Sequence, residues 1–75
     1  MKLVLYGRRY CHLCEDMAVA LRSRGIEFEE IDVDSDPELE VRWGELVPVL
    51  TDSQGSEICH YHLDEAALDQ ALRVK

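Results

Sequence analysis

Hydrophobic and polar residues follow one another along the chain with a spacing that changes from strand-like to helical. The apolar run at residues 2–6 stops at Gly7, a pattern typical of a central strand covered on both faces. Beyond it, apolar residues recur with helical spacing, which predicts a helix that Gly25 is placed to end. The predicted inner face of that helix consists of Leu13, Met17, Ala18 and Leu21.

Residues 26–34 return to an extended pattern with β-branched side chains and predict a second strand. A strand, a helix and a strand this close in sequence imply a right-handed crossover and parallel pairing. A short helix is then predicted to end at Gly44. At its start, Ser35 and Glu38 have the spacing of a capping box, and Pro37 falls in the first turn.

The last part of the chain predicts a hairpin and a final helix. Two short strands fall within residues 47–61, around the turn-forming residues 52–55, and Asp64 can cap the helix that follows. The buried stripe of that helix is predicted to be Leu68, Ala71 and Leu72. The order βαβαββα describes an α/β fold, a small four-stranded mixed sheet flanked by three helices, that uses residues 1–75 as a single domain.

The composition narrows the possible functions. With 47% hydrophobic and 32% charged residues, the chain has enough apolar area for a folded core. Eight basic and sixteen acidic residues give a net charge of -8, so a nucleic-acid interface, which needs a basic face, is not expected. No apolar run has the length of a membrane span. Three cysteines, an odd number, favour a reducing cytoplasm over a secreted disulfide framework.

Cys11 and Cys14 stand where the first strand pattern gives way to the helical pattern. Cys11 is expected at the helix start, where free backbone N–H groups and the helix dipole stabilise a thiolate. Arg8 and Arg9 add positive charge nearby. Cys14 lies one helical turn later, with its side chain tilted back toward Cys11. Because a Cys11 thiolate can attack a disulfide and Cys14 can then displace the product, the pattern favours a thiol–disulfide exchange site.

Val47 and Pro48 begin the predicted hairpin. The third strand must run antiparallel to the first, so its start and Cys11 lie at the same end of the sheet. A cis Val47–Pro48 peptide would make a tight turn there and present Val47 backbone groups beside the dithiol, whereas the alternative is a simple turn proline. The fourth strand brings residues 59–64 to the same end.

Other interpretations remain open at this point. The two cysteines could be a structural pair, or half of a zinc site, since Cys₂His₂ and Cys₃His sets satisfy zinc. The residues that would complete the zinc site are Cys59, His60 and His62. Their spacing is a weak zinc pattern, and Cys59 is more simply a small buried hydrophobe. A further alternative is an inactive adaptor that binds a basic partner protein through the acidic run at residues 27–40.

The chain as a whole resembles a short glutaredoxin of the thioredoxin-like fold, of the compact type with a C-x-L-C site. The segments that carry the resemblance are LYGRRYCHLC at residues 5–14 and LVPVL at residues 46–50. The resemblance implies that Cys11 is the nucleophile and Cys14 the resolving thiol. It also implies that Arg8, three positions before the first cysteine, helps to bind glutathione.

The same resemblance implies that Pro48 is a cis-proline and that the Val47 backbone pairs with substrate. The sequence departs from the glutaredoxin pattern in two places. The Pro-Tyr pair common between the glutaredoxin cysteines is His12-Leu13 here, and the Gly-Gly pair after the fourth strand is replaced by Cys59 and His60. The added side chains stand where glutathione would approach the backbone, so the resemblance supports disulfide exchange more than glutathione specificity.

The remaining side chains near the dithiol have two interpretations each. His12, when protonated, would stabilise a Cys11 thiolate or donate a proton to the departing thiol, or it is an exposed residue without a task. Tyr10 would line a thiol-binding groove or only cover the helix start. Trp43 is expected to pack in the core.

The sequence therefore predicts a monomeric cytoplasmic dithiol–disulfide oxidoreductase that reduces protein disulfides or glutathione mixed disulfides. It needs no bound metal or organic cofactor, because the cysteines carry the electrons. Glutathione is a candidate co-substrate, and either glutathione or a reductase must recycle the dithiol. No membrane or nucleic-acid partner is expected.

Overall fold

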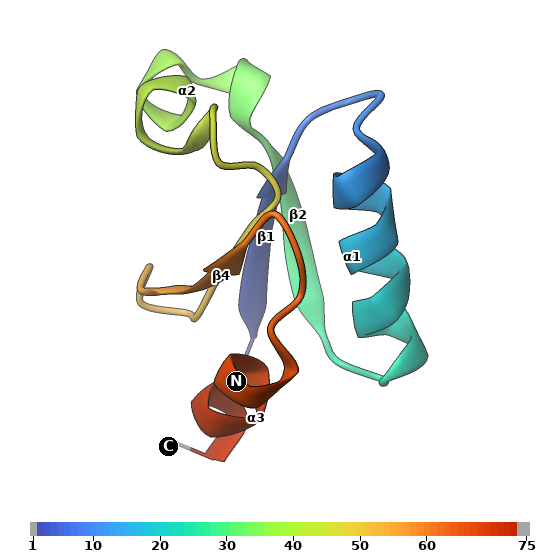
Figure 1. Ribbon diagram of the computed structural model, residues 1–75. Helices are drawn as coiled ribbons and strands as arrows, with labels where there is room; N and C mark the ends of the chain where they lie inside the picture. The colour runs from blue at the N-terminus through green and yellow to red at the C-terminus, as the bar shows by residue number, and fades with distance from the viewer. Residues whose placement is uncertain (1, 74–75) are drawn as a thin grey trace.

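Four strands form one mixed sheet in the computed structural model, which describes residues 2–73 (Figure 1). The spatial order is β2-β1-β3-β4. The strands span β1 (Leu3–Gly7), β2 (Phe28–Asp32), β3 (Val49–Thr51) and β4 (Glu57–His60). β1 pairs with β2 in parallel and with β3 antiparallel, and β4 runs antiparallel to β3. The predicted element order, the parallel crossover and the hairpin are therefore confirmed.

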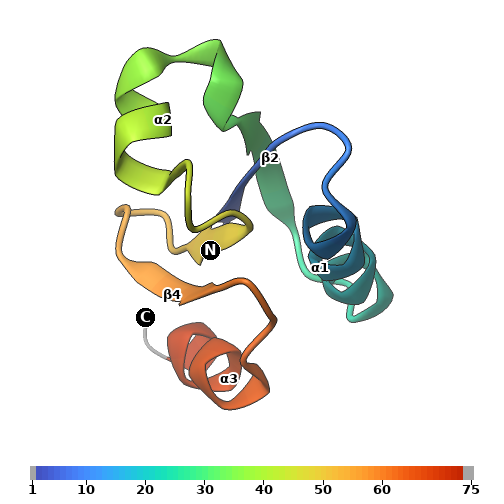
Figure 2. The same ribbon diagram turned by 45° about the horizontal axis from the view of Figure 1, so that its top comes forward.

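Helices cover both faces of the sheet, and the alternation of side chains along β1 explains how (Figures 1 and 2). Leu3 and Leu5 point to the face packed by α1 (His12–Ser23) and α3 (Glu65–Arg73). Tyr6 points to the other face, which is packed by η1 (Val33–Ser35) and α2 (Pro37–Trp43). Two apolar layers of different size result, as expected for a strand that is buried on both sides.

The larger layer lies under α1 and α3. It consists of Leu3, Leu5, Met17, Ala18, Leu21, Leu50, Cys59 and Leu68. The smaller layer under α2 consists of Val33, Trp43 and Val49, and Tyr6 stacks on Trp43 with ring centroids 5.7 Å apart. Trp43 is therefore a core residue, as predicted.

The inner face of α1 differs from the prediction at one position. Leu13 is 37% exposed, whereas Cys14 is 8% exposed and takes its place beside Met17, Ala18 and Leu21. Cys14, Ala18 and Leu21 are spaced by four and three residues, so they share one helical face with Met17. Leu13 lies one position before this face. The N-terminal turn of α1 therefore buries a sulfur instead of a leucine.

The start of α2 also differs from the prediction. Ser35 belongs to η1, and its hydroxyl donates to the Asp32 carbonyl at 2.6 Å, so it does not cap the helix. The N-cap is Asp36, whose carboxylate accepts the Glu38 backbone N–H at 2.9 Å. The extra turn of η1 moves the entry into α2 one residue further, with Pro37 at its first position. The stop at Gly44 is confirmed, because its N–H still binds the Glu40 carbonyl.

The other ends agree with the turn chemistry of the sequence. Gly25 has φ of 70° and closes α1, with its N–H on the Arg22 carbonyl. In the hairpin, the Asp52 carboxylate accepts the Gln54 and Ser56 backbone N–H groups, at 2.8 and 3.0 Å. The Asp64 carboxylate accepts the Ala67 N–H at 3.0 Å and caps α3. None of the helices in residues 2–73 is long and apolar enough to cross a membrane.

The docking of α3 can be tested at Leu68, which is fully buried between α3 and the sheet. Leu68→Ala is expected to lower the free energy of unfolding by about 2–5 kcal/mol, because it leaves a cavity in the larger core. Val41→Ala, at a position that is 87% exposed, is the matched control and should change stability by less than about 0.5 kcal/mol. Urea unfolding of both variants measures the difference, and a near-neutral Leu68→Ala would contradict this packing.

Candidate active site

Cys11 occupies the N-cap of α1, in the loop that follows β1. Its backbone is extended, with φ of -111° and ψ of 109°, and its carbonyl accepts the Glu15 N–H. Its sulfur accepts the backbone N–H of Cys14, with Sγ and N 3.1 Å apart. The position of Cys11 at the start of the helix is the one expected from the sequence.

Cys14 lies beneath Cys11 and next to the end of β1. The Cys14 sulfur faces Gly7, where a Cβ would lie 3.1 Å from Sγ, so glycine leaves the room for this sulfur. Burial, and to a smaller extent a hydrogen bond between the two cysteine side chains, raises the pKa of Cys14 to about 11. The Arg8 backbone N–H and the Arg8 charge act in the opposite direction. Cys14 is thus a protonated, buried thiol at neutral pH, whereas Cys11 is half-buried.

Val47 and Pro48 meet the same end of the sheet, since Val49 of β3 pairs with Tyr6 of β1. The Val47–Pro48 peptide is cis, as the resemblance implied. The buried Pro48 presents its carbonyl to the Tyr61 N–H at 2.9 Å. Among the residues that the structure describes, the Val47 backbone makes no hydrogen bond, so its N–H and carbonyl can pair with an added chain.

Tyr61 is a site residue that the sequence did not indicate. It follows β4 with φ of 66°, a left-handed conformation that favours glycine, and its hydroxyl donates to the Glu45 carbonyl at 3.2 Å. Its backbone N–H donates to the Pro48 carbonyl and so joins the end of β4 to the cis-proline. The resemblance aligns the Gly-Gly pair of glutaredoxins with Cys59 and His60. The residue of this segment that adopts the left-handed conformation favoured by glycine is instead Tyr61. Only the backbone angles reveal it.

Tyr10 and His12 flank Cys11 on the surface. Tyr10 is 99% exposed and has φ of 59°, an unusual and strained conformation for an aromatic residue directly before the N-cap. His12 opens the helix and is exposed. Neither ring packs against the core, so both are free to contact a bound molecule.

The Arg8 side chain turns to η1 and α2. Its guanidinium donates to the Asp34 carboxylate at 3.1 Å, to both oxygens of Glu40 at 3.0 and 3.1 Å, and to the Gly44 carbonyl at 2.6 Å. The Arg8 backbone therefore lies next to Cys14, whereas its guanidinium binds acceptors in η1 and at the end of α2.

The residues of the zinc alternative do not come together. Cys59 packs in the larger core, where burial raises its pKa, and His60 Nδ1 lies 2.5 Å from the Glu57 carboxylate. His62 is exposed. Within residues 2–73 there is no group of three or more His, Cys, Asp or Glu side chains that could hold a metal ion. The structure thus offers no ligand set to the zinc hypothesis.

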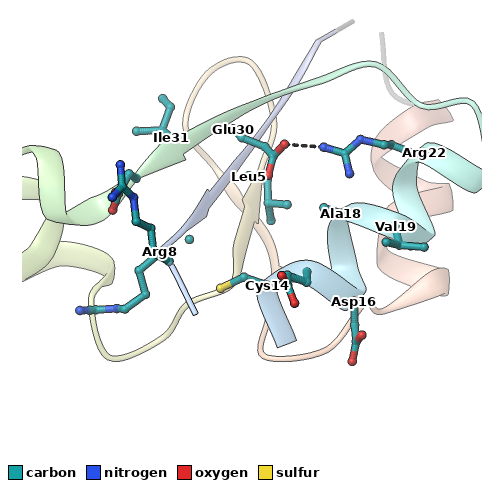
Figure 3. A pocket seen from close by; sticks show the side chains of 13 residues that line it. Leu5, Arg8, Cys14, Asp16, Ala18, Val19, Arg22, Glu30 and Ile31 are labelled. Carbon is teal, nitrogen blue, oxygen red and sulfur yellow. Dashed lines mark hydrogen bonds and ion pairs between the residues drawn. The ribbon is translucent and has the colours of Figure 1, made fainter. Parts of the chain in front are cut away.

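A groove of about 830 Å³ opens between α1, β1 and β2, next to Cys14 (Figure 3). Leu5 and Ala18 contribute apolar lining, and Arg8 and Cys14 lie at one part of it. The Arg22–Glu30 ion pair, 2.6 Å long, links α1 to β2 across the groove. Sequence reasoning missed this groove because it arises only where the helix meets the edge strand.

The chain matches known proteins over nearly its whole length. Residues 2–73 match the family model described as Glutaredoxin-like domain (DUF836). The solution structure of protein Ne2328 from Nitrosomonas europaea is 39% identical, with a TM-score of 0.84 over 93% of this chain and 88% of that one. The X-ray structure of protein XcR50 from X. campestris is 36% identical, with a TM-score of 0.79 and 97% of both chains covered. No curated protein matches the chain.

More distant structures show the fold. The glutaredoxin Grx-1 from Archaeoglobus fulgidus is 21% identical, with a TM-score of 0.65 over 95% of this chain and 85% of that one. The four-stranded mixed sheet with three helices is therefore the thioredoxin-like fold that the sequence predicted. On the match of its residues 2–73, the chain belongs to the glutaredoxin-like (DUF836) family.

Proposed function

We propose that this glutaredoxin-like protein is a thiol–disulfide oxidoreductase in which Cys11 attacks and Cys14 resolves. The observation that carries the proposal is the asymmetry of the two sulfurs. Cys11 is half-buried at a helix N-cap and accepts a backbone N–H, whereas Cys14 is buried, protonated and in hydrogen-bond contact with it. One sulfur is thus prepared for attack and the other is kept in reserve.

The exchange proceeds in two displacements. The Cys11 thiolate attacks one sulfur of a substrate disulfide, so a mixed disulfide forms and the other substrate sulfur leaves as a thiolate. Cys14 then loses its proton and attacks the Cys11 sulfur, which releases the second substrate thiolate and leaves a Cys11–Cys14 disulfide. Two electrons pass from the protein dithiol to the substrate disulfide, which becomes two thiols.

Substrate binding is assigned to the surface around Cys11. The Val47 backbone has no hydrogen-bond partner within residues 2–73 and precedes the fixed Pro48, so it can pair with an extended segment that carries the disulfide. Tyr10 can cover the bound thiol, and His12 can donate a proton to the departing sulfur. The substrates proposed are protein disulfides and glutathione mixed disulfides in a reducing compartment such as the cytoplasm. Glutathione or a reductase then restores the dithiol, and no bound cofactor is needed.

The order of the two displacements can be tested by single turnover with hydroxyethyl disulfide, acid quench and mass measurement. Wild-type protein should lose two hydrogens, through the Cys11–Cys14 disulfide. Cys14→Ser should stop with one mercaptoethanol attached to Cys11, and Cys11→Ser should react at least about 100-fold more slowly, because Cys14 is buried and protonated.

Cys59→Ser is the control for the third thiol, since Cys59 packs in the core and has no part in the exchange. It should react like wild type. A wild-type dithiol that reacts with the disulfide no faster than an unstructured cysteine peptide would instead favour an inactive adaptor.

The pH dependence of alkylation tests the state of Cys14. In Cys11→Ser, the burial of Cys14, the larger cause of its raised pKa, remains. A raised pKa keeps the reactive thiolate scarce at neutral pH, so the rate with iodoacetamide should climb about tenfold per pH unit and level off only above pH 9.0, the ordinary value. The rate at each pH is measured by mass mapping of the alkylated peptide that contains Cys14. Levelling at or below that pH would contradict the buried thiol.

A further inference from the structure

The positive charge of Arg8 is paired with two carboxylates of the same chain, those of Asp34 and Glu40. We infer that Arg8 is a positioning residue that ties the dithiol loop to the segment before the cis-proline, and that this chain therefore does not select glutathione disulfides over neutral ones. The inference rests on the proposed function and narrows its substrate class to disulfides recognised by shape and backbone. It departs from the glutathione-binding role that the resemblance implied for this position.

Two elements supply the partners of the Arg8 guanidinium. One nitrogen donates to Asp34 in η1, and the other donates to the Glu40 carboxylate in α2 and to the Gly44 carbonyl at its end. The planar fork of arginine is suited to acceptors that lie in different directions. The guanidinium thus has two carboxylates and one carbonyl around it before any ligand arrives.

Gly44 shows that the chain makes room for this arrangement. Its φ of -55° and ψ of -35° are helical, so its backbone does not require glycine. Its space does, because a Cβ at residue 44 would overlap the Glu40 carboxylate and the Glu40 carbonyl oxygen. The Glu40 carboxylate that binds Arg8 therefore lies directly over the Gly44 Cα, and a side chain at that position would push it away.

The network connects the two parts of the site. Arg8 directly follows β1 and stands in the loop that leads to Cys11, while Gly44 precedes Val47 and Pro48 in the loop that leads to β3. The hydrogen bonds from Arg8 to Glu40 and Gly44 fix these loops relative to each other. The distance between the attacking sulfur and the Val47 backbone, which an incoming disulfide must span, therefore depends on Arg8.

The same pairing removes the attraction for an anionic ligand. Oxidised glutathione carries more carboxylates than ammonium groups and is an anion at neutral pH. A guanidinium shared by Asp34 and Glu40 presents little net positive charge to it, and the net charge of the whole chain is -8. Arg9 is exposed and has no carboxylate partner in residues 2–73, but a charge in water is screened and adds little selectivity.

The test compares single-turnover rates of the reduced protein with oxidised glutathione, an anion, and hydroxyethyl disulfide, which is neutral. At about 0.5 M salt, where the charges are screened, Arg8→Gln should slow both reactions by roughly tenfold or more, and by the same factor within about twofold, because the loops lose their alignment. A loss confined to oxidised glutathione would show that Arg8 is an anion ligand and would overturn the inference. Arg42→Gln, which removes an exposed arginine of α2, is the control and should leave both rates within about twofold.

Glu40→Gln provides a readout that a role in stability alone would not move. It removes one carboxylate from Arg8, so the ratio of the oxidised glutathione rate to the hydroxyethyl disulfide rate should rise by roughly two- to fivefold at low salt. That rise should disappear at about 0.5 M salt, where the charges are screened. An unchanged ratio at low salt would contradict the claim that carboxylate pairing blocks the charge, and it does so even where Arg8→Gln fails to fold.

Failure of the inference and failure of the proposed function give different results. A wild-type dithiol that reacts with neither disulfide faster than an unstructured cysteine peptide refutes the proposed exchange, whatever Arg8 does. A wild-type dithiol that reacts quickly with both, together with selective loss of the oxidised glutathione reaction in Arg8→Gln, refutes only the role assigned to Arg8.

Discussion

The hydrogen bond from the Cys14 N–H to the Cys11 sulfur makes the first turn of α1 and the dithiol one unit. The N–H would otherwise be one of the unpaired donors at a helix start, and the sulfur would otherwise be solvated by water. The same hydrogen bond thus caps the helix and gives the Cys11 sulfur a backbone donor. Helix α1 is held on the sheet by Met17, Ala18 and Leu21, so the cap is fixed in space by the core.

Depth is the main cause of the raised pKa that sets the Cys14 sulfur apart from the Cys11 sulfur. Both belong to the same turn of the same helix, but Cys14 turns inward, where Gly7 leaves a space for it, and Cys11 does not. Burial penalises a charged sulfur, which accounts for the raised pKa of Cys14. The missing side chain at Gly7 of β1 therefore provides the space in which the Cys14 thiol is buried.

A second glycine, Gly44, makes room for another interaction, on the other side of the sheet. Gly44 leaves the space in which the Glu40 carboxylate binds Arg8, and Arg8 in turn joins the loop of Cys11 to the loop of Pro48. The acidic run that the sequence displays is thus partly consumed within the fold: Asp34 and Glu40 neutralise Arg8, Asp36 caps α2, and Glu30 pairs with Arg22.

The pattern of the sequence predicted the elements where local chemistry acts alone. Gly25, the 52–55 turn and Asp64 determine their ends through positive φ or a side-chain cap, and all three are found as predicted. The prediction was wrong where two local solutions compete. Ser35 and Asp36 can both cap a helix, and the turn of η1 selects Asp36. Leu13 and Cys14 can both face inward, and the packing of α1 on β1 selects the cysteine.

The sequence by itself determined the order of the elements, the position of the dithiol at a helix start and the meeting of Pro48 with it at one end of the sheet. These follow from periodicity, spacing and strand direction. Only the tertiary structure decided the partners of Arg8, the backbone of Tyr61 and the groove beside Cys14. Each of these joins residues far apart in the chain, and a long charged side chain such as Arg8 can reach several acceptors. Which of them it binds depends on how the helices settle on the sheet.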